Sequence, residues 1–440
     1  MYPRVNTIKK GDRTYHYLQI LESFRKDGRA HQRVVANLGR LDLLGDNLDR
    51  LVAALSKHCK ETFITANHLE CKQSLTWGPV LLARYLWRRM ELSDIIHKHC
   101  QSARLQFDVA ETSFVLVANR LCEPASEHGL ARWLEHTFVC DSRGRRWQPD
   151  WLPAKQITRR QRVKVEHRQL NRWYRTLDVL LAAKENIEEA LYQRVRDLFS
   201  VKVDLVFYDL TSSYFCRKQP KQTLRRHGQS KDKRPRQVQV VLGVVMANGF
   251  PIAHHVFPGN TADKSTLKKV LTDLQERFGL GHIMVVSDRG LVSEENLQFL
   301  SEDKYILKTD DRQITAADAV ACYKELSTVE RGFRDLKDVI EMRPMYHKTD
   351  ERIEAHIFVA SLALFLKRVL EHQLVSKLPE ISATEAFAAM KSVGVVDLDF
   401  HGQRKRLVSA GGRDARRLVA ALGIRDIAPA DLGMSSQQRL

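Results

Sequence analysis

A short apolar stretch that ends in a carboxylate, residues 203–212, constrains the fold of this chain most. It reads Val-Asp-Leu-Val-Phe-Tyr-Asp-Leu-Thr-Ser, and five of its first six residues are apolar. A nearly continuous run of β-branched, aromatic and leucine side chains is typical of a strand that is covered on both faces, in the middle of a sheet. We therefore expect a central strand that ends at Asp209.

The carboxylate of Asp209 has two interpretations. An aspartate that follows a strand commonly forms a turn or a cap. Alternatively, it is a catalytic or metal-binding acid, because open α/β folds carry their chemistry at the carboxyl edge of the sheet. The choice depends on whether other carboxylates converge on the same edge.

The charge of the chain indicates a polyanionic partner. The formal net charge is +18 and the pI is about 9.6. Residues 217–236 hold nine Lys or Arg and a single acid, and residues 155–172 hold seven more against one acid. A solvated basic surface would not require such clustering, so we expect nucleic acid as the partner.

The composition favours a cytoplasmic protein. No run approaches the ~20 apolar residues that span a bilayer, and the first residues lack the apolar core of a signal peptide. The seven cysteines are scattered, which is typical of free thiols in a reducing compartment. The His and Cys residues at 68–71 and 97–100 lack a second half with zinc-site spacing, so we expect no structural zinc there.

The sequence patterns divide the chain into four parts. These are a small β unit at 1–45, a helical region at 46–200, an α/β domain at 201–375, and a basic, partly helical tail at 376–440. In the first part we expect strands at 13–20 and 32–39. A basic segment at 141–168, a linker or a nucleic-acid-facing loop, interrupts the helical region.

The order of strand-like and helical segments in the third part predicts a mixed sheet flanked by helices, which is an α/β class. Beyond the central strand, we expect strands at 238–247, 252–257, 283–287 and 304–307. We expect helices at 263–278, 293–300, 316–340 and 352–373.

Asp288 repeats the pattern of Asp209, because it follows the apolar run 283–287 and precedes a glycine-containing turn. If the two strands are parallel neighbours, both carboxylates lie at the same sheet edge and repel unless a cation lies between them. Oxygen ligands without Cys or His favour Mg²⁺ or Mn²⁺ over zinc.

A third acid is expected from the helix at 316–340. Five residues at helical spacing form one stripe on it: Tyr323, Leu326, Glu330, Phe333 and Lys337. Lys337 follows Glu330 by two turns, about 10.5 Å along the axis, which suits a lysine on the DNA backbone and a glutamate on the metal. The alternative is that both side chains are simply solvated.

These acids carry a resemblance to a known family. Asp209 in Tyr-Asp-Leu-Thr, Asp288 in Ser-Asp-Arg-Gly and Glu330 in Val-Glu-Arg-Gly-Phe-Arg-Asp-Leu-Lys resemble the three acids of the DDE transposases of bacterial insertion sequences. Tyr323 and Lys337 match the tyrosine-arginine-glutamate-lysine signature of one group. Further similar stretches lie at 227–232, 258–263, 343–347 and 352–356. The resemblance covers about 200–370 strongly and the N-terminal β unit more loosely.

The chain departs from that family in two places. Leu326 stands where the signature has its arginine. The large, mostly β insertion that many relatives carry between the second aspartate and the glutamate is missing. Handling of a transposon-end hairpin, a role associated with that insertion, is therefore not implied.

The resemblance implies an RNase H-like core in which Asp209, Asp288 and Glu330 hold two Mg²⁺ (or Mn²⁺) ions. It implies Mg²⁺-dependent cleavage of transposon ends, followed by in-line attack of the 3′-OH on target DNA. It implies that the region 201–375 is the catalytic domain and that the region 46–200 serves DNA-end binding and dimerisation. We expect a homodimer or larger assembly on DNA, acting at the bacterial nucleoid without a membrane. The residues expected to contact DNA are Lys337, Tyr323, Arg225, Arg226, Lys231, Lys233, Arg234, His347 and Arg352.

Two other interpretations stay open. One is a metal-dependent nuclease that does not join strands. The other is a DNA-binding remnant of a transposase that has lost catalysis together with the insertion. The presence of all three acids, Asp209, Asp288 and Glu330, argues against the second.

Overall fold

The structure is a computed structural model of the 440-residue chain. It describes residues 1–56, 69–100, 105–141, 146–147, 159–199, 205–215, 224–231, 234, 236–279, 284–286, 293, 295–296, 298, 306–307, 330–343, 345–400 and 403–429. The chain forms two compact units. One consists of Met1–Glu70 with Asp399–Gln403, and the other of Cys71–Leu398 with Arg404–Leu440. Within the ranges given, no helix has the length and apolar character needed to cross a membrane.

The first unit contains an antiparallel sheet of three strands in the order β1-β2-β3. They are β1 (Tyr2–Lys10), β2 (Arg13–Lys26) and β3 (Arg29–Arg40), and they are followed by α1 (Leu41–Leu44), η1 (Gly45–Asn47) and α2 (Leu48–Ser56). The sequence analysis predicted the second and third strands but not β1. This strand is largely polar and exposed, so it lacks the apolar alternation on which such a prediction depends.

The second unit begins with helices over most of the predicted helical region. They are α3 (Gly78–Arg89), α4 (Leu92–His99), α5 (Val109–Cys122), α6 (Leu130–His136), α7 (Arg159–Ala182) and α8 (Lys184–Phe199). Helices α7 and α8 meet at Ala183. The helix α7 begins inside the basic segment that was expected to be a linker or loop.

A small sheet joins segments that are far apart in the sequence. Its strands are β4 (Leu69–Thr76), β10 (Gly394–Phe400) and β11 (Gln403–Val408), in the order β11-β10-β4. The tail also carries α13 (Ala383–Met390) and α14 (Arg413–Leu422). The strands of this sheet were not predicted.

The main sheet has five strands in the order β7-β6-β5-β8-β9. They are β5 (Leu205–Tyr214), β6 (Gln239–Ala247), β7 (Phe250–Pro258), β8 (Met284–Val286) and β9 (Ile306–Leu307). Pairing is antiparallel among β7, β6 and β5, and parallel among β5, β8 and β9. The predicted mixed α/β class and the central place of the strand at 203–212 are therefore confirmed.

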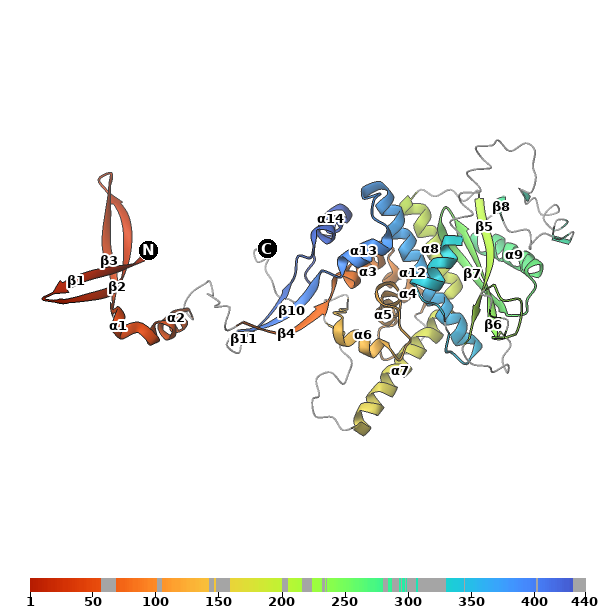
Figure 1. The fold of residues 1–440 in the computed structure, drawn as a ribbon. Coiled ribbons are helices and arrows are strands. Elements are labelled where there is room, and N and C mark those ends of the chain that lie inside the picture. The colour runs from red at the N-terminus through yellow and green to blue at the C-terminus, as the bar shows by residue number, and fades with distance from the viewer. Residues whose placement is uncertain are drawn as a thin grey trace. The chain divides into compact units, whose positions relative to one another are not determined.

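Alternate side chains of β5 enter two different cores. Tyr208 and Leu210 pack with α9 (Leu267–Phe278) on one face of the sheet. Phe207 belongs to the larger core, which includes α12 (Asp350–Lys377) on the other face. Figure 1 shows α9 beside the sheet on one side and α12 on the other. The sheet is thus covered by helices on both faces, as its apolar strands require.

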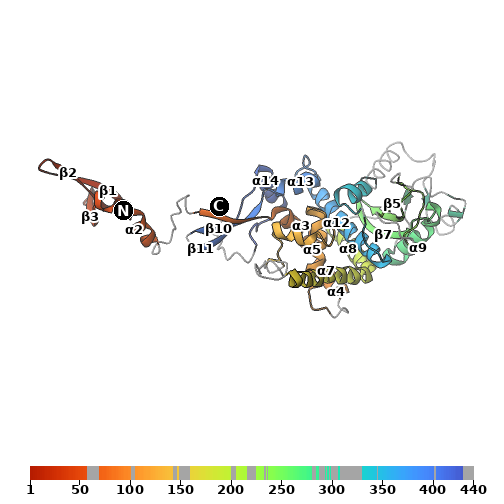
Figure 2. The same cartoon turned by 60° about the horizontal axis from the view of Figure 1, so that its bottom comes forward.

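The helix α12 is the central element of the second unit. Its stretch Ile357–Leu366 is apolar apart from Ser361, and all of these residues except Ser361 are buried. A helix that is apolar on all sides needs neighbours on all sides. Helices α5 and α7 and strand β7 contact it, and both views show it between the sheet and the helices α3 and α5 (Figures 1 and 2).

Two stretches that were singled out in the sequence, 227–232 and 258–263, lie against each other. A β-carbon built on Gly228 would lie 1.8 Å from the carbonyl oxygen of Gly259. The side-chain amide of Gln239 donates hydrogen bonds to the carbonyls of Gln229 and Gly259, each at 3.0 Å. Glycine is therefore required at 228 by close backbone approach.

Replacing Gly228 with alanine tests this contact. The added methyl group meets backbone that cannot rotate away, and overpacking of this kind costs about 1–3 kcal/mol. We expect Gly228→Ala to lower the Tm measured by differential scanning calorimetry. Gly412→Ala is the control, because its β-carbon would meet Ser392 Oγ at an ordinary 3.5 Å. Equal Tm values for the two variants would contradict the packing described.

Candidate active site

Asp209 lies inside β5, where the pairing on the two sides of the strand differs. On one side β5 pairs with β6 from Phe207 to Tyr214, and Asp209 is opposite Val244. On the other side, the described pairing with β8 ends at Phe207. The expectation that the strand ends at Asp209 is therefore wrong: the antiparallel partner extends the strand to Tyr214. Asp209 lies instead just beyond the end of the described parallel pairing, and it is half-buried.

The strands that precede Asp209 and Asp288 are parallel neighbours, as the sequence analysis supposed. Phe207 of β5 is in register with Val286 of β8. Asp209 and Asp288 each follow those residues by two positions. Asp288 itself lies outside the described residues.

The side chain of Asp209 belongs to the face of the sheet that α12 covers. Residues two apart in a strand point to the same face, and Phe207 packs in the core that contains α12. Val244, which is opposite Asp209, packs in the same core. The backbone N–H of Leu210 donates a 2.7 Å hydrogen bond to Asp209 Oδ1.

Glu330 begins the described part of a helix with two kinds of turn. Residues 330–334 are α-helical, and η5 (Asp335–Val339) is a π-helical turn closed by the hydrogen bond from Ile340 N to Asp335 O, 2.8 Å. The prediction of a regular α-helix to Ile340 is therefore wrong over its last turn. Glu330 is exposed and Lys337 is half-buried, and the spacing of about 10.5 Å that α-helical geometry predicts between them no longer applies.

The helix of Glu330 packs on the same face of the sheet as Asp209. A β-carbon built on Gly332 would lie 3.8 Å from Met246 Cε and 3.9 Å from Leu364 Cδ2 of α12. Met246 pairs with Phe207, two residues before Asp209. Asp209 and Glu330, which are 121 positions apart in the sequence, thus belong to segments on the same face of the sheet.

A buried ion pair fixes the π-helical turn to α12. Asp335 Oδ2 lies 3.0 Å from Lys367 Nζ and 3.2 Å from Arg368 Nη2. All three side chains are at least nine-tenths buried. Both cations also pair with Glu371, one turn further along α12. This network was missed in the sequence analysis, and it holds the helix of Glu330 in place.

Lys231 connects the basic loop to β5 beside Asp209. Its ammonium group donates a 2.8 Å hydrogen bond to the carbonyl of Leu210 and lies 3.2 Å from Asp263 Oδ2. Its backbone N–H donates to Ser212 Oγ at 3.0 Å. The stretches 227–232 and 258–263 therefore meet next to the strand that carries the first acid.

The other residues predicted to contact DNA have varied surroundings. Arg226 and Arg234 are exposed, and Arg234 lies over the ring of Tyr214 at 4.5 Å. Arg352 lies over the ring of Tyr174 at 4.3 Å. Arg225 is buried and donates a 2.8 Å hydrogen bond to the carbonyl of Lys348. Two further residues of this prediction, Tyr323 and Lys233, lie outside the described ranges. DNA contact by each residue of the predicted set stays a prediction.

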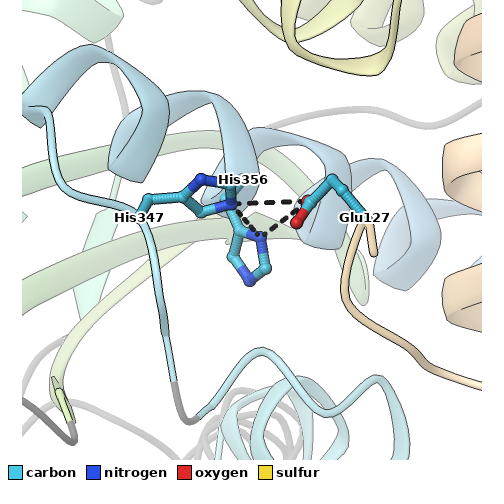
Figure 3. A group of neighbouring side chains, drawn as sticks. All are labelled: Glu127, His347 and His356. Carbon is cyan, nitrogen blue, oxygen red and sulfur yellow. Dashed lines mark hydrogen bonds and ion pairs between the residues drawn. The ribbon is translucent and has the colours of Figure 1, made fainter. Parts of the chain in front are cut away.

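His347, also predicted to contact DNA, is buried in a cluster with Glu127 and His356 (Figure 3). In the part of the chain that the structure describes, these three residues are the group whose His and carboxylate atoms converge closely enough for a metal ion. Glu127 precedes α6 and His356 lies in α12. The sequence analysis singled out the stretches around both histidines but not Glu127, which is more than 200 residues away.

Removal of the charge of Asp335 tests the anchoring of the π-helical turn. Asp335→Asn removes one of the two carboxylates that pair with the buried Lys367 and Arg368 and leaves only Glu371, and the loss of a buried ionic partner costs up to about 3–5 kcal/mol. We expect a clearly lower Tm than for Asp338→Asn, whose carboxylate is exposed and pairs with Arg343 at 3.1 Å. Thermal unfolding followed by circular dichroism measures both variants, and a Tm of Asp335→Asn at or above the control would refute the anchoring role.

Comparison with known proteins finds two families along this chain. Residues 3–68 match the IS1634 family transposase, N-terminal domain, and residues 204–366 match the transposase DDE domain. No curated protein matches the chain.

A search of solved structures finds a chain of the "Crystal structure of a pre-cleavage Mos1 transpososome". The match has 13% sequence identity and a TM-score of 0.18, and covers 60% of this chain and 98% of the other. The two family matches include the N-terminal sheet, the strand of Asp209 and the helix of Glu330. By these matches, the chain belongs to the DDE transposases of bacterial insertion sequences.

Proposed function

We propose that this transposase cleaves transposon ends and joins the freed 3′-OH to target DNA, using an RNase H-like domain. The observation that carries the proposal is the parallel register of β5 with β8. If that register continues for two positions, Asp209 and Asp288 would lie side by side, as we propose. The order β7-β6-β5-β8-β9, with three antiparallel strands followed by two parallel ones, supports the RNase H-like assignment.

The residues proposed for the metal site fit Mg²⁺. Asp209, Asp288 and Glu330 offer carboxylate oxygens, the ligand type that Mg²⁺ and Mn²⁺ prefer. Asp209 is half-buried and Glu330 is exposed, so neither carboxylate is sealed in the core. Two ions held there would activate a water for attack on the phosphodiester and stabilise the leaving 3′ oxygen.

The chain's own residues position the acids and the DNA. Pairing with β6 and β8 fixes the backbone of Asp209, and the ion pair of Asp335 fixes the helix of Glu330. Lys231 holds the basic loop against β5. Lys337 and the exposed arginines Arg226 and Arg234 would bind phosphates, which orients the DNA end without reading its sequence.

A nuclease that does not join strands would use the same acids. The family matches favour the transposase, because they include an N-terminal domain described from transposases as well as the DDE domain. We propose that the protein works as a dimer or larger assembly on DNA at the nucleoid, so that two ends are held together.

Removing one carboxylate at a time tests the catalytic assignment. Asp209→Asn and Asp288→Asn each remove a metal ligand, which is worth several kcal/mol of transition-state stabilisation, so we expect Mg²⁺-dependent end cleavage to fall by at least about 10²-fold. DNA binding, measured by fluorescence anisotropy, should change little, because the basic residues remain.

The control for these variants is Asp94→Asn, an exposed acid on α4, which should cleave normally. Gel analysis of the wild-type reaction with target DNA reports joined products, and their absence would favour the nuclease. Normal cleavage by Asp209→Asn would overturn the proposed active site.

The phosphate-binding role of Arg234 predicts a change in salt dependence. Removing one phosphate contact should weaken binding and reduce the slope of log K against log[salt] by about one. Arg234→Ala should show both effects in anisotropy titrations at several salt concentrations. Arg234→Lys keeps the charge and should retain the slope. An unchanged slope in Arg234→Ala would remove this arginine from the interface.

A further inference from the structure

A second metal site is suggested by the geometry of the Glu127–His347–His356 cluster (Figure 3). The atoms that face one another are Glu127 Oε1, His347 Nε2 and His356 Nδ1. Their separations are 3.1 Å between the two nitrogens, 3.3 Å from His347 to Glu127, and 3.5 Å from His356 to Glu127. Two tetrahedral ligands that are each about 2.05 Å from zinc lie about 3.3 Å apart. The triangle therefore has the size of one face of a zinc tetrahedron.

The hydrogen bonding of His356 leaves a lone pair on the nitrogen that faces the cluster. His356 Nε2 lies 3.2 Å from the carbonyl oxygen of Met342. A carbonyl can only accept, so the proton of the neutral ring belongs on Nε2, and Nδ1 carries the lone pair that a metal would bind. A backbone carbonyl that accepts from the second ring nitrogen is the usual outer partner of a metal-bound histidine.

We propose that Glu127, His347 and His356 form a site for a divalent transition-metal ion, with Zn²⁺ as the best match. Two imidazole nitrogens and one carboxylate select zinc and its neighbours rather than Mg²⁺. Three protein ligands leave a fourth position for a water. A cavity of about 730 Å³, lined in part by Glu127 and His347, would supply that water.

Arg120 is the group that competes with a metal. Its Nη2 lies 3.4 Å from His356 Nδ1, and its Nη1 donates to the carbonyl of Glu341 at 3.2 Å. Without an ion, Arg120 and His347 would donate hydrogen bonds to the acceptor atoms of Glu127 and His356. The cluster would then be a buried polar network. The bond to Glu341 gives Arg120 a partner that a bound metal does not remove.

The ion would tie together three segments of the second unit. Glu127 lies in the connection between α5 and α6, His347 between η5 and α12, and His356 in the second turn of α12. The cavity beside them is also lined by Arg225, Lys348 and Arg352. A cation bound here would therefore order the end of the segment that leads from the helix of Glu330 into α12.

Cobalt substitution tests the site in the full-length protein. We expect chelator-treated protein to bind one Co²⁺ per chain with the intense visible absorption of a four-coordinate ion, and Zn²⁺ to displace it. Glu127→Gln should lower the affinity by at least about tenfold. Asp209→Asn should bind Co²⁺ normally, because the proposed Mg²⁺ site has only oxygen ligands. This separates the present inference from the proposed catalytic function.

The matched control is His136→Gln. It removes an exposed His–carboxylate contact, in which His136 Nε2 lies 3.2 Å from Glu123 Oε2. It should retain Co²⁺ binding. Zinc-edge X-ray absorption of the wild-type protein adds a test that needs no variant, and it should report two imidazole ligands. A wild-type protein without a four-coordinate cobalt spectrum, or a spectrum unaffected by Glu127→Gln, would overturn the proposal, as would a zinc spectrum without imidazole.

Discussion

The two-sided pairing of β5 is the constraint on which the rest of the domain depends. Antiparallel β6 extends along the strand to Tyr214, whereas the described part of parallel β8 pairs only up to Phe207. Asp209 lies where these two patterns diverge. Its backbone is held by the pairing of β5 with β6, and its side chain lies on the face of the sheet that α12 covers. A central strand that is paired on both sides fixes the position of the acid that we propose for catalysis.

The helix of Glu330 depends on buried charge for its position. Asp335, Lys367 and Arg368 are each costly to bury alone, and their mutual contacts offset that cost. The π-helical turn that contains Asp335 follows directly on the segment of Glu330. Such turns are frequent at functional sites. Packing in the larger core, the buried ion pair and the pairing of β5 therefore all hold the segments of Asp209 and Glu330 in position.

Features that depend on local sequence patterns were predicted, whereas features that depend on contacts between distant segments were missed. The apolar run before Asp209 and its repetition before Asp288 predicted two strands, and the condition that these strands be parallel neighbours is met by β5 and β8. The continuation of β5 past Asp209 was missed because it depends on pairing with β6. The π-helical turn was missed because Asp335 pairs with residues of α12. Glu127 meets His347 and His356 only through the tertiary fold, so no spacing in the sequence could indicate that cluster.

Iron-directed cleavage of the polypeptide tests the central claim most directly, because it maps the metal site without altering any residue. With hydrogen peroxide as the oxidant and ascorbate as the reductant, Fe²⁺ bound in place of Mg²⁺ generates hydroxyl radicals that cut nearby backbone, and mass spectrometry locates the cuts. The proposed active site predicts cuts near Asp209, Asp288 and Glu330 together, all suppressed by excess Mg²⁺. Cuts near Glu127, His347 and His356 would instead be suppressed by Zn²⁺. Mg²⁺-sensitive cuts at only one of the three acids, or at none, would contradict a shared site.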